Sequence, residues 1–91
     1  MKMYAAIYIG TYEISLKVYE VTKEKCLKEI DCLRTKTEIA KDLYQYNRLS
    51  KETIEHLLKT LTSMKETIEM YQVNHYQAFA SYSIKPATNI L

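Results

Sequence analysis

Glycine, proline and cysteine are scarce in this chain of 91 residues, which has one glycine, one proline and two cysteines. Its apolar runs are far shorter than the roughly 20 residues that a membrane-spanning helix needs. The N-terminus lacks the apolar core and cleavage site of a signal peptide. Charge is nearly balanced, with 13 basic and 11 acidic residues, so charge alone indicates no nucleic-acid partner. We therefore expect a cytoplasmic protein that binds neither nucleic acid nor membranes.

The length and composition indicate one small folded domain. Hydrophobic residues make up 47% of the chain and charged residues 26%, which argues against disorder. A chain of this size buries roughly 60–65% of its unfolded surface. Its stability without a partner is therefore expected to be modest.

The two cysteines, Cys26 and Cys32, are expected to be ordinary reduced thiols. Both fall in one predicted strand, where six residues span about 20 Å. A disulfide requires Cα atoms within about 7 Å, so no bridge between them is expected. Their spacing is not that of a metal site, and no neighbouring histidine completes one.

Hydrophobic periodicity divides the chain into strands and one long helix. Residues 3–9 are apolar at successive positions, which predicts a strand buried on both faces. Ile14, Leu16 and Val18 alternate with polar residues in a second strand. The expected elements are strands at 3–9, 13–22, 26–35 and 76–80, a helical turn at 39–44, and helices at 51–72 and 84–91.

The long helix has the clearest signals. Ser50 is a suitable N-cap, and Leu49 with Ile54 can form a hydrophobic staple around it. One apolar stripe follows the helix and comprises Ile54, Leu57, Leu58, Leu61, Met64, Ile68 and Tyr71. Most of these positions also fit a short coiled-coil seam. Leu58 broadens the stripe, however, which favours packing on a sheet.

Two segments carry a resemblance to a known family. The first is Tyr4-Ala-Ala-Ile-Tyr-Ile-Gly10-Thr-Tyr-Glu-Ile14, and the second is Ala80-Ser-Tyr-Ser-Ile-Lys-Pro-Ala-Thr-Asn89. Together they resemble the exopolyphosphatase/guanosine pentaphosphate phosphohydrolase (Ppx/GppA) family, which opens with A-I-D-I-G-S-N/Y-x-I and later carries A-T-S-A-I-R-E-A-x-N. The order and spacing of the elements fit the family over nearly the whole chain. Tyr8 stands at the family's aspartate, Lys85 at its arginine and Pro86 at its glutamate.

The resemblance implies an α/β fold, the opening half of a ribonuclease-H-like (actin-like ATPase) domain. Such a half-domain has three antiparallel strands, a crossover helix, and a fourth strand parallel to the first. A fifth strand is absent from the sequence, so residues 76–81 should form an open edge. Unpaired edge groups are a template for pairing with another chain, and a second copy could supply it.

The candidate phosphate-binding residues are Gly10, Thr11, Tyr12 and Lys85. Glycine lets backbone N–H groups approach an anion closely, but a glycine hairpin can also serve only to reverse the chain. Lys85 offers a point charge where arginine offers a two-pronged donor, or it is a solvated lysine near a helix start. By family analogy, an aspartate at position 8 would organise the metal or the attacking water. The phenol of Tyr8 cannot supply that carboxylate, and its bulk would crowd the pocket.

Other polar residues are less informative. Ser81, Ser83 and Asn89 match small or polar family positions, or they cap a helix. His56 on the helix and His75 in the loop after it are expected to be surface residues. The nine tyrosines are scattered over several elements, so packing explains them better than a nucleic-acid groove.

The expected function follows from the positions at which the chain departs from the family pattern, namely Tyr8, Lys85 and Pro86. Residues 1–91 are interpreted as an N-terminal subdomain of an exopolyphosphatase-like phosphatase, truncated before the catalytic region and not catalytic alone. The family's complete enzyme implies a magnesium cofactor and hydrolysis of terminal phosphate from polyphosphate or guanosine pentaphosphate. Phosphate or polyphosphate binding is the retained activity that we expect. The alternative is an interaction module that forms a homodimer, or pairs with another subunit, through the edge at 76–81.

Overall fold

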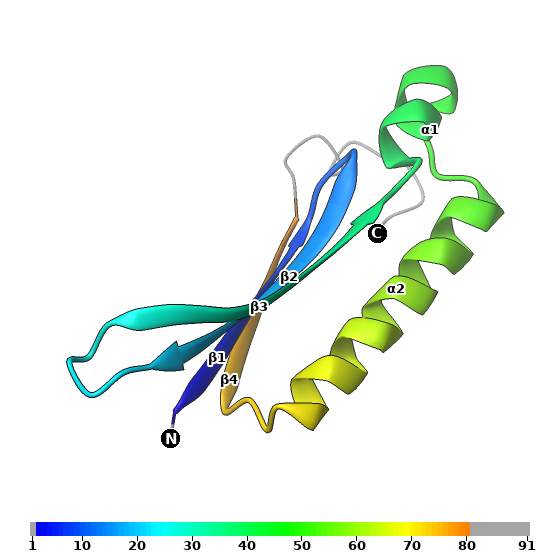
Figure 1. The fold of residues 1–91 in the computed structure, drawn as a ribbon. Helices are drawn as coiled ribbons and strands as arrows, with labels where there is room; N and C mark the ends of the chain where they lie inside the picture. The colour runs from blue at the N-terminus through cyan, green and yellow to red at the C-terminus, as the bar shows by residue number, and fades with distance from the viewer. Residues whose placement is uncertain (1, 81–91) are drawn as a thin grey trace.

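The computed structural model describes residues 2–80. Four strands and two helices follow one another in the order that the sequence predicts (Figure 1). They are β1 (Met3–Ile9), β2 (Glu13–Val21), β3 (Leu27–Lys36), α1 (Ile39–Tyr46), α2 (Lys51–Met70) and β4 (His75–Ala80). Neither of these helices is long and apolar enough to cross a membrane.

The strands form one sheet in the order β3-β2-β1-β4. Strand β2 pairs antiparallel with both β1 and β3, whereas β4 pairs parallel with β1. The connection from β3 to β4 passes through both helices, and α2 lies along one face of the sheet (Figure 1). This arrangement confirms the predicted actin-like half-domain.

The first helix is longer than the helical turn expected at residues 39–44. It continues to Tyr46 and ends at Asn47, which has the left-handed φ of 53°. The Asn47 N–H donates to the Leu43 carbonyl oxygen at 3.1 Å. Asparagine tolerates this conformation better than most residues, which explains why the helix stops there.

The start of α2 confirms the predicted cap and staple. The Ser50 hydroxyl oxygen accepts a hydrogen bond from the Thr53 N–H at 3.2 Å. Leu49 is buried together with Ile39, and Ile54 packs against this pair. The capping hydrogen bond satisfies one of the free N–H groups at the helix start, and the apolar contact fixes the direction in which the chain enters.

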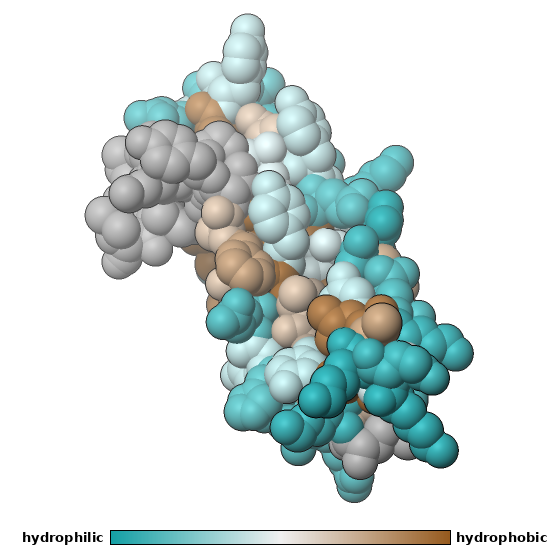
Figure 2. Space-filling view, turned by 90° about the vertical axis from the view of Figure 1, so that its left-hand side faces the viewer, coloured by the Kyte–Doolittle hydropathy of each residue, from teal (hydrophilic) through white to brown (hydrophobic). Residues whose placement is uncertain are grey.

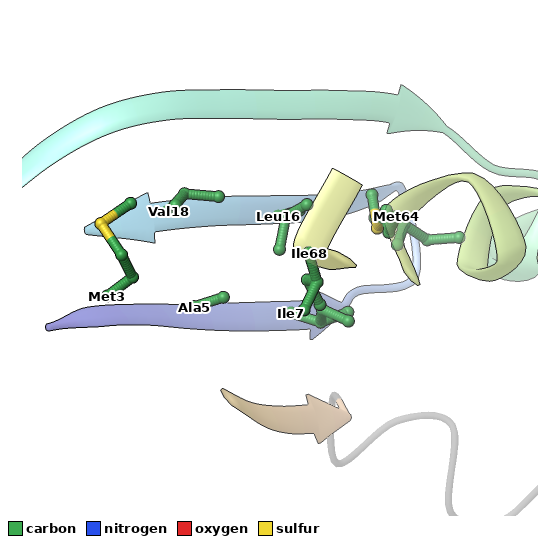
Figure 3. Packing of buried hydrophobic residues seen from close by; sticks show 8 residues of the cluster. Met3, Ala5, Ile7, Leu16, Val18, Met64 and Ile68 are labelled. Atoms are coloured by element: carbon green, nitrogen blue, oxygen red, sulfur yellow. The ribbon is translucent and has the colours of Figure 1, made fainter. Parts of the chain in front are cut away.

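The main core lies between α2 and the strands β1 and β2. Met3, Ala5 and Ile7 from β1 face the same side as Leu16 and Val18 from β2, toward Met64 and Ile68 (Figure 3). Leu57, Leu61, Tyr71 and Val73 are partly buried against this cluster. The apolar stripe of α2 therefore packs on the sheet, as expected, rather than forming a coiled coil.

Leu58 does not broaden that stripe, and its assignment to the packing face was wrong. Its side chain is 58% exposed, whereas Thr53 and Thr60 are buried. On a helix with 3.6 residues per turn, position 58 points about 100° away from position 57.

The expectation that β1 is buried on both faces was also wrong. Residues Met3, Ala5 and Ile7 are buried, but Tyr8 is 48% exposed and Tyr4 and Ala6 are only partly covered. The pairing register places a row of side chains on this uncovered side of the sheet, here called the open face: Tyr4, Ala6, Tyr8, Tyr19, His75, Gln77 and Phe79. Seen from the side away from α2, apolar side chains gather in the middle of the molecule (Figure 2).

Among residues 2–80, β4 is an outer strand of the sheet, next to β1 alone, and all six of its residues are exposed. Residue 81 of the predicted edge and the helix expected at 84–91 lie outside the described residues. Both cysteines are free, but Cys26 precedes β3 rather than lying in it, and it is exposed.

Candidate functional site

The turn that joins β1 to β2 contains three of the four candidate phosphate-binding residues. The Gly10 N–H donates to the Glu13 carbonyl oxygen at 2.9 Å, which closes the turn. Gly10 is buried and has no positive φ. A Cβ at this position would lie 2.8 Å from the Glu13 carbonyl oxygen and 3.0 Å from Cε2 of Tyr8. Glycine is therefore needed for close packing in the hairpin, and its own N–H is already used.

Thr11 and Tyr12 are held through their carbonyl groups. The Thr11 carbonyl oxygen accepts from the Ala40 N–H at 2.8 Å, and the Tyr12 carbonyl oxygen accepts from the Thr37 N–H at 3.0 Å. These bonds attach the turn to the junction between β3 and α1. Within residues 2–80 the N–H groups of Thr11 and Tyr12 donate to no protein acceptor. Two backbone N–H groups on an anchored turn can donate hydrogen bonds to an anion.

Tyr8 lies beside this turn. Its ring is the side chain nearest to the position of a Gly10 Cβ. Across the sheet, Tyr8 is opposite Ser15 of β2 and Phe79 of β4. The phenol therefore occupies space next to the turn at the position where the family resemblance puts a carboxylate.

The charges around the turn do not fit a magnesium site. The carboxylate of Glu13 lies 3.8 Å from Nη1 of Arg34, and Lys36 is opposite Glu13 in the sheet. Within residues 2–80 no group of three or more His, Cys, Asp or Glu side chains could hold a metal ion. A phenol at position 8 is also a poor ligand for a hard cation that prefers carboxylate oxygens.

Lys85, the remaining candidate, lies outside the described residues, as do Ser81, Ser83, Pro86 and Asn89. The structure therefore places Gly10, Thr11 and Tyr12 in one turn and leaves their proximity to Lys85 a prediction.

The histidines lie far apart in the fold. His56 is exposed on α2. His75 is the first residue of β4 rather than part of a loop, and its ring stacks on that of Tyr4 with centroids 5.7 Å apart. Its contact with Tyr4 makes it part of the open face.

The open face is hollowed beside this stacked pair. The hollow has a volume of about 690 Å³, and its lining includes Tyr4, Tyr19, Leu27, His75 and Phe79. Ala6 leaves the space because its side chain is short and its neighbours on the face are large. The sequence did not reveal this surface, because both sides of β1 are apolar and only the fold decides which side is covered.

Asp42 is a buried acid that the sequence analysis missed. Its side chain is 5% exposed, and Oδ2 accepts a hydrogen bond from the Ser50 N–H at 2.7 Å. Burial alone would raise the pKa of Asp42, but hydrogen bonds from the Ser50 N–H and from the hydroxyls of Thr53 and Ser50 outweigh it and lower the pKa. This carboxylate ties α1 to the start of α2.

A second polar contact ties the end of α2 to the sheet. The Tyr71 hydroxyl donates to Oδ2 of Asp31 on β3 at 2.7 Å. This hydrogen bond raises the pKa of Tyr71, because it stabilises the protonated phenol. The hydrogen bonds of Asp31 and Asp42 go to Tyr71 and Ser50 and not to residues of the Gly10–Tyr12 turn, so both acids stabilise the packing of α2.

Comparison with known proteins identifies the fold. No protein-family model matches the chain, and no curated protein matches it by sequence. Among solved structures, the type II variant of the Aquifex aeolicus Ppx/GppA phosphatase superposes with a TM-score of 0.92 at 25% identity, over 98% of this chain and 29% of that one. A second structure of the Aquifex aeolicus family member gives 0.91 at 26% identity. An exopolyphosphatase from Cytophaga hutchinsonii gives 0.87 at 15% identity, which shows the fold alone.

The sheet order, the crossover and the parallel β4 define an actin-like half-domain. In fold and in the order of its elements, this chain is similar to the N-terminal part of the first domain of the Ppx/GppA phosphatases. It spans less than a third of the length of those proteins.

Proposed function

We propose that this chain is a half-domain of the Ppx/GppA type that works by pairing with a second copy of itself through the edge of β4. We also propose that it hydrolyses no phosphate by itself. The observation that carries the first proposal is β4, an edge strand whose six residues are all exposed. The second rests on Tyr8, which lies beside the Gly10 turn at the position of the family's aspartate.

The edge of β4 lacks the features that usually prevent pairing. Its sequence, HYQAFA, has no proline, lysine or acidic residue, and these are the residues with which natural proteins protect an edge. Two of its side chains, Tyr76 and Phe79, are 59% and 52% exposed. An added strand would satisfy the outward N–H and carbonyl groups of β4 and cover part of these rings.

The expected dimer is weak. Half of an aromatic side chain amounts to roughly 100 Å², so these two rings supply only part of the roughly 800 Å² per partner of a standard interface. We therefore expect association at micromolar concentrations.

Sedimentation velocity of the 91-residue chain across micromolar concentrations tests the pairing. We expect a shift from monomer to dimer as the concentration rises. A Gln77→Lys variant, which places a charge on the edge, should remain monomeric. A chain that stays monomeric throughout this range would contradict the proposal.

A second candidate function is phosphate or polyphosphate binding at the Gly10–Tyr12 turn with Lys85. The specific support is the pair of N–H groups on Thr11 and Tyr12, which have no acceptor within residues 2–80. Calorimetric titration with short polyphosphate, with and without magnesium, tests this function. Saturable binding that weakens in Lys85→Ala would support phosphate binding. The control is Lys23→Ala, which changes an exposed lysine in the β2–β3 turn and should leave the affinity unchanged. Absence of heat with and without magnesium would contradict phosphate binding.

A Tyr8→Asp variant distinguishes a phosphate pocket that the Tyr8 ring blocks from a pocket that no longer exists. If the turn still forms a phosphate pocket, restoring the carboxylate should give affinity for magnesium or phosphate in the same titration. No gain would count against a retained pocket.

We also propose a cytoplasmic location. Both cysteines are free, and Cys26 is exposed. Reducing compartments keep such thiols in this form.

A further inference from the structure

We infer that the second copy adds to β4 in an antiparallel direction, with Gln77 of one copy directly opposite Gln77 of the other. The inference rests on the proposed self-association and specifies its geometry. It follows from the symmetry of a closed dimer, from the pleat of β4 and from the side chains that the strand presents.

A closed dimer of identical edges cannot be parallel. A two-fold axis along the strands would place each residue beside its own copy but with the side chain on the opposite face. Neighbouring residues in a sheet point to the same face, because the pleats of adjacent strands are aligned. A two-fold axis perpendicular to the sheet avoids this conflict, since it reverses the strand and leaves the faces unchanged. The isologous dimer is therefore antiparallel.

The same pleat restricts the register. His75, Gln77 and Phe79 lie on the open face, and Tyr76, Ala78 and Ala80 lie on the helix side. Residues that face each other across the two strands must point to the same face. The axis must therefore lie between two copies of the same residue, so that one residue of β4 faces its own copy. Centres at Gln77 and Ala78 leave the fewest residues unpaired: the first leaves out only Ala80, and the second only His75.

The side chains favour the centre at Gln77. There, His75 of each copy is opposite Phe79 of the other, which gives two aromatic pairs, and the two Gln77 amides can hydrogen bond. With the centre at Ala78, Gln77 is opposite Phe79 and Ala78 is opposite itself. Aromatic cross-strand pairs each contribute about 0.2–1 kcal/mol relative to alanine pairs.

This arrangement also joins the open faces. Because the axis is perpendicular to the sheet, both open faces lie on the same side of the extended sheet. Tyr4 stacks on His75 within each copy, and His75 then meets Phe79 of the second copy. The hollow beside this pair, lined in part by His75 and Phe79, would therefore gain walls from both copies.

Disulfide trapping tests the register. Both native cysteines are first replaced in Cys26→Ser/Cys32→Ser, because the exposed Cys26 would cross-link by itself. Single cysteines are then introduced at Gln77, at Ala78 and, as a control, at Glu66, which is exposed on α2. Opposed Cα atoms in an antiparallel pair are about 4.5–5.5 Å apart, which suits a disulfide. Sedimentation of the reduced variants reports the dimer independently of the cross-link.

We expect Gln77→Cys to form a covalent dimer about tenfold faster than Ala78→Cys or Glu66→Cys, because only its thiols meet at the axis. Faster trapping at Ala78→Cys would overturn the register. Equal, slow trapping at all three sites, in variants that still sediment as dimers, would overturn both of the registers that pair β4 most fully and leave self-association intact. Monomers in every sedimentation experiment would overturn both the inference and the proposed dimer.

Discussion

Gly10 shows how a single residue can be required for packing rather than for a ligand. A Cβ there would meet a backbone carbonyl oxygen at 2.8 Å, and a hairpin backbone cannot move away as easily as a side chain can. We expect Gly10→Ala to lower the free energy of unfolding by about 1–3 kcal/mol. Tyr12→Ala, at a side chain that is 77% exposed, should change it by less than about 0.5 kcal/mol. Urea denaturation of both variants measures the difference, and equal stabilities would contradict this explanation.

Asp42 makes part of the stability dependent on pH. Its pKa is lowered in the folded protein, so its charged form contributes stability above the unfolded pKa of about 3.9, and the contribution is lost as the pH falls toward the folded value. Asp42→Asn retains an acceptor for the Ser50 N–H but removes the charge. We expect a loss of about 1 kcal/mol at pH 7, shrinking toward pH 3. Urea denaturation at both pH values measures this loss, and a difference independent of pH would contradict it.

The two sides of α2 differ in what they contribute to the fold. Met64 is 2% exposed in the core and Leu58 is 58% exposed, although both are apolar in the sequence. We expect Met64→Ala to cost about 2–5 kcal/mol and Leu58→Ala to cost less than about 0.5 kcal/mol. Thermal unfolding of the two variants distinguishes them. A large loss at Leu58 would show that this side of the helix is covered.

At the scale of the whole molecule, most of the fold could be predicted from local patterns. The alternation of Ile14, Leu16 and Val18 and the apolar stripe of α2 repeat with the period of their elements, and Ser50 marks the helix start locally. The exposure of Tyr8 and Leu58 could not be predicted, because it depends on which face another element covers. Periodicity shows that a side is apolar, but not what lies against it.

The candidate site was less predictable, because its chemistry depends on contacts between distant residues. The single glycine pointed to the right turn. However, the anchoring of Thr11 and Tyr12 comes from N–H groups of Ala40 and Thr37, far along the chain. The bond between Asp42 and Ser50 likewise joins two elements and follows no spacing rule. The sequence therefore located the turn but could not show which of its donors are already used.

The whole molecule should gain stability from its second copy, which makes its melting temperature depend on concentration. A ligand that binds only the folded state raises stability by mass action, and a second copy is such a ligand. For a domain of this size we expect the melting temperature to rise by about 3–5 °C per tenfold increase in concentration once dimers form. Gln77→Lys should remove this dependence, because two lysines would face each other at the axis. The same change at Gln45, exposed on α1, should leave it intact. Calorimetric scans at increasing micromolar protein concentrations measure this dependence. A melting temperature independent of concentration in the unaltered chain would contradict the dimer.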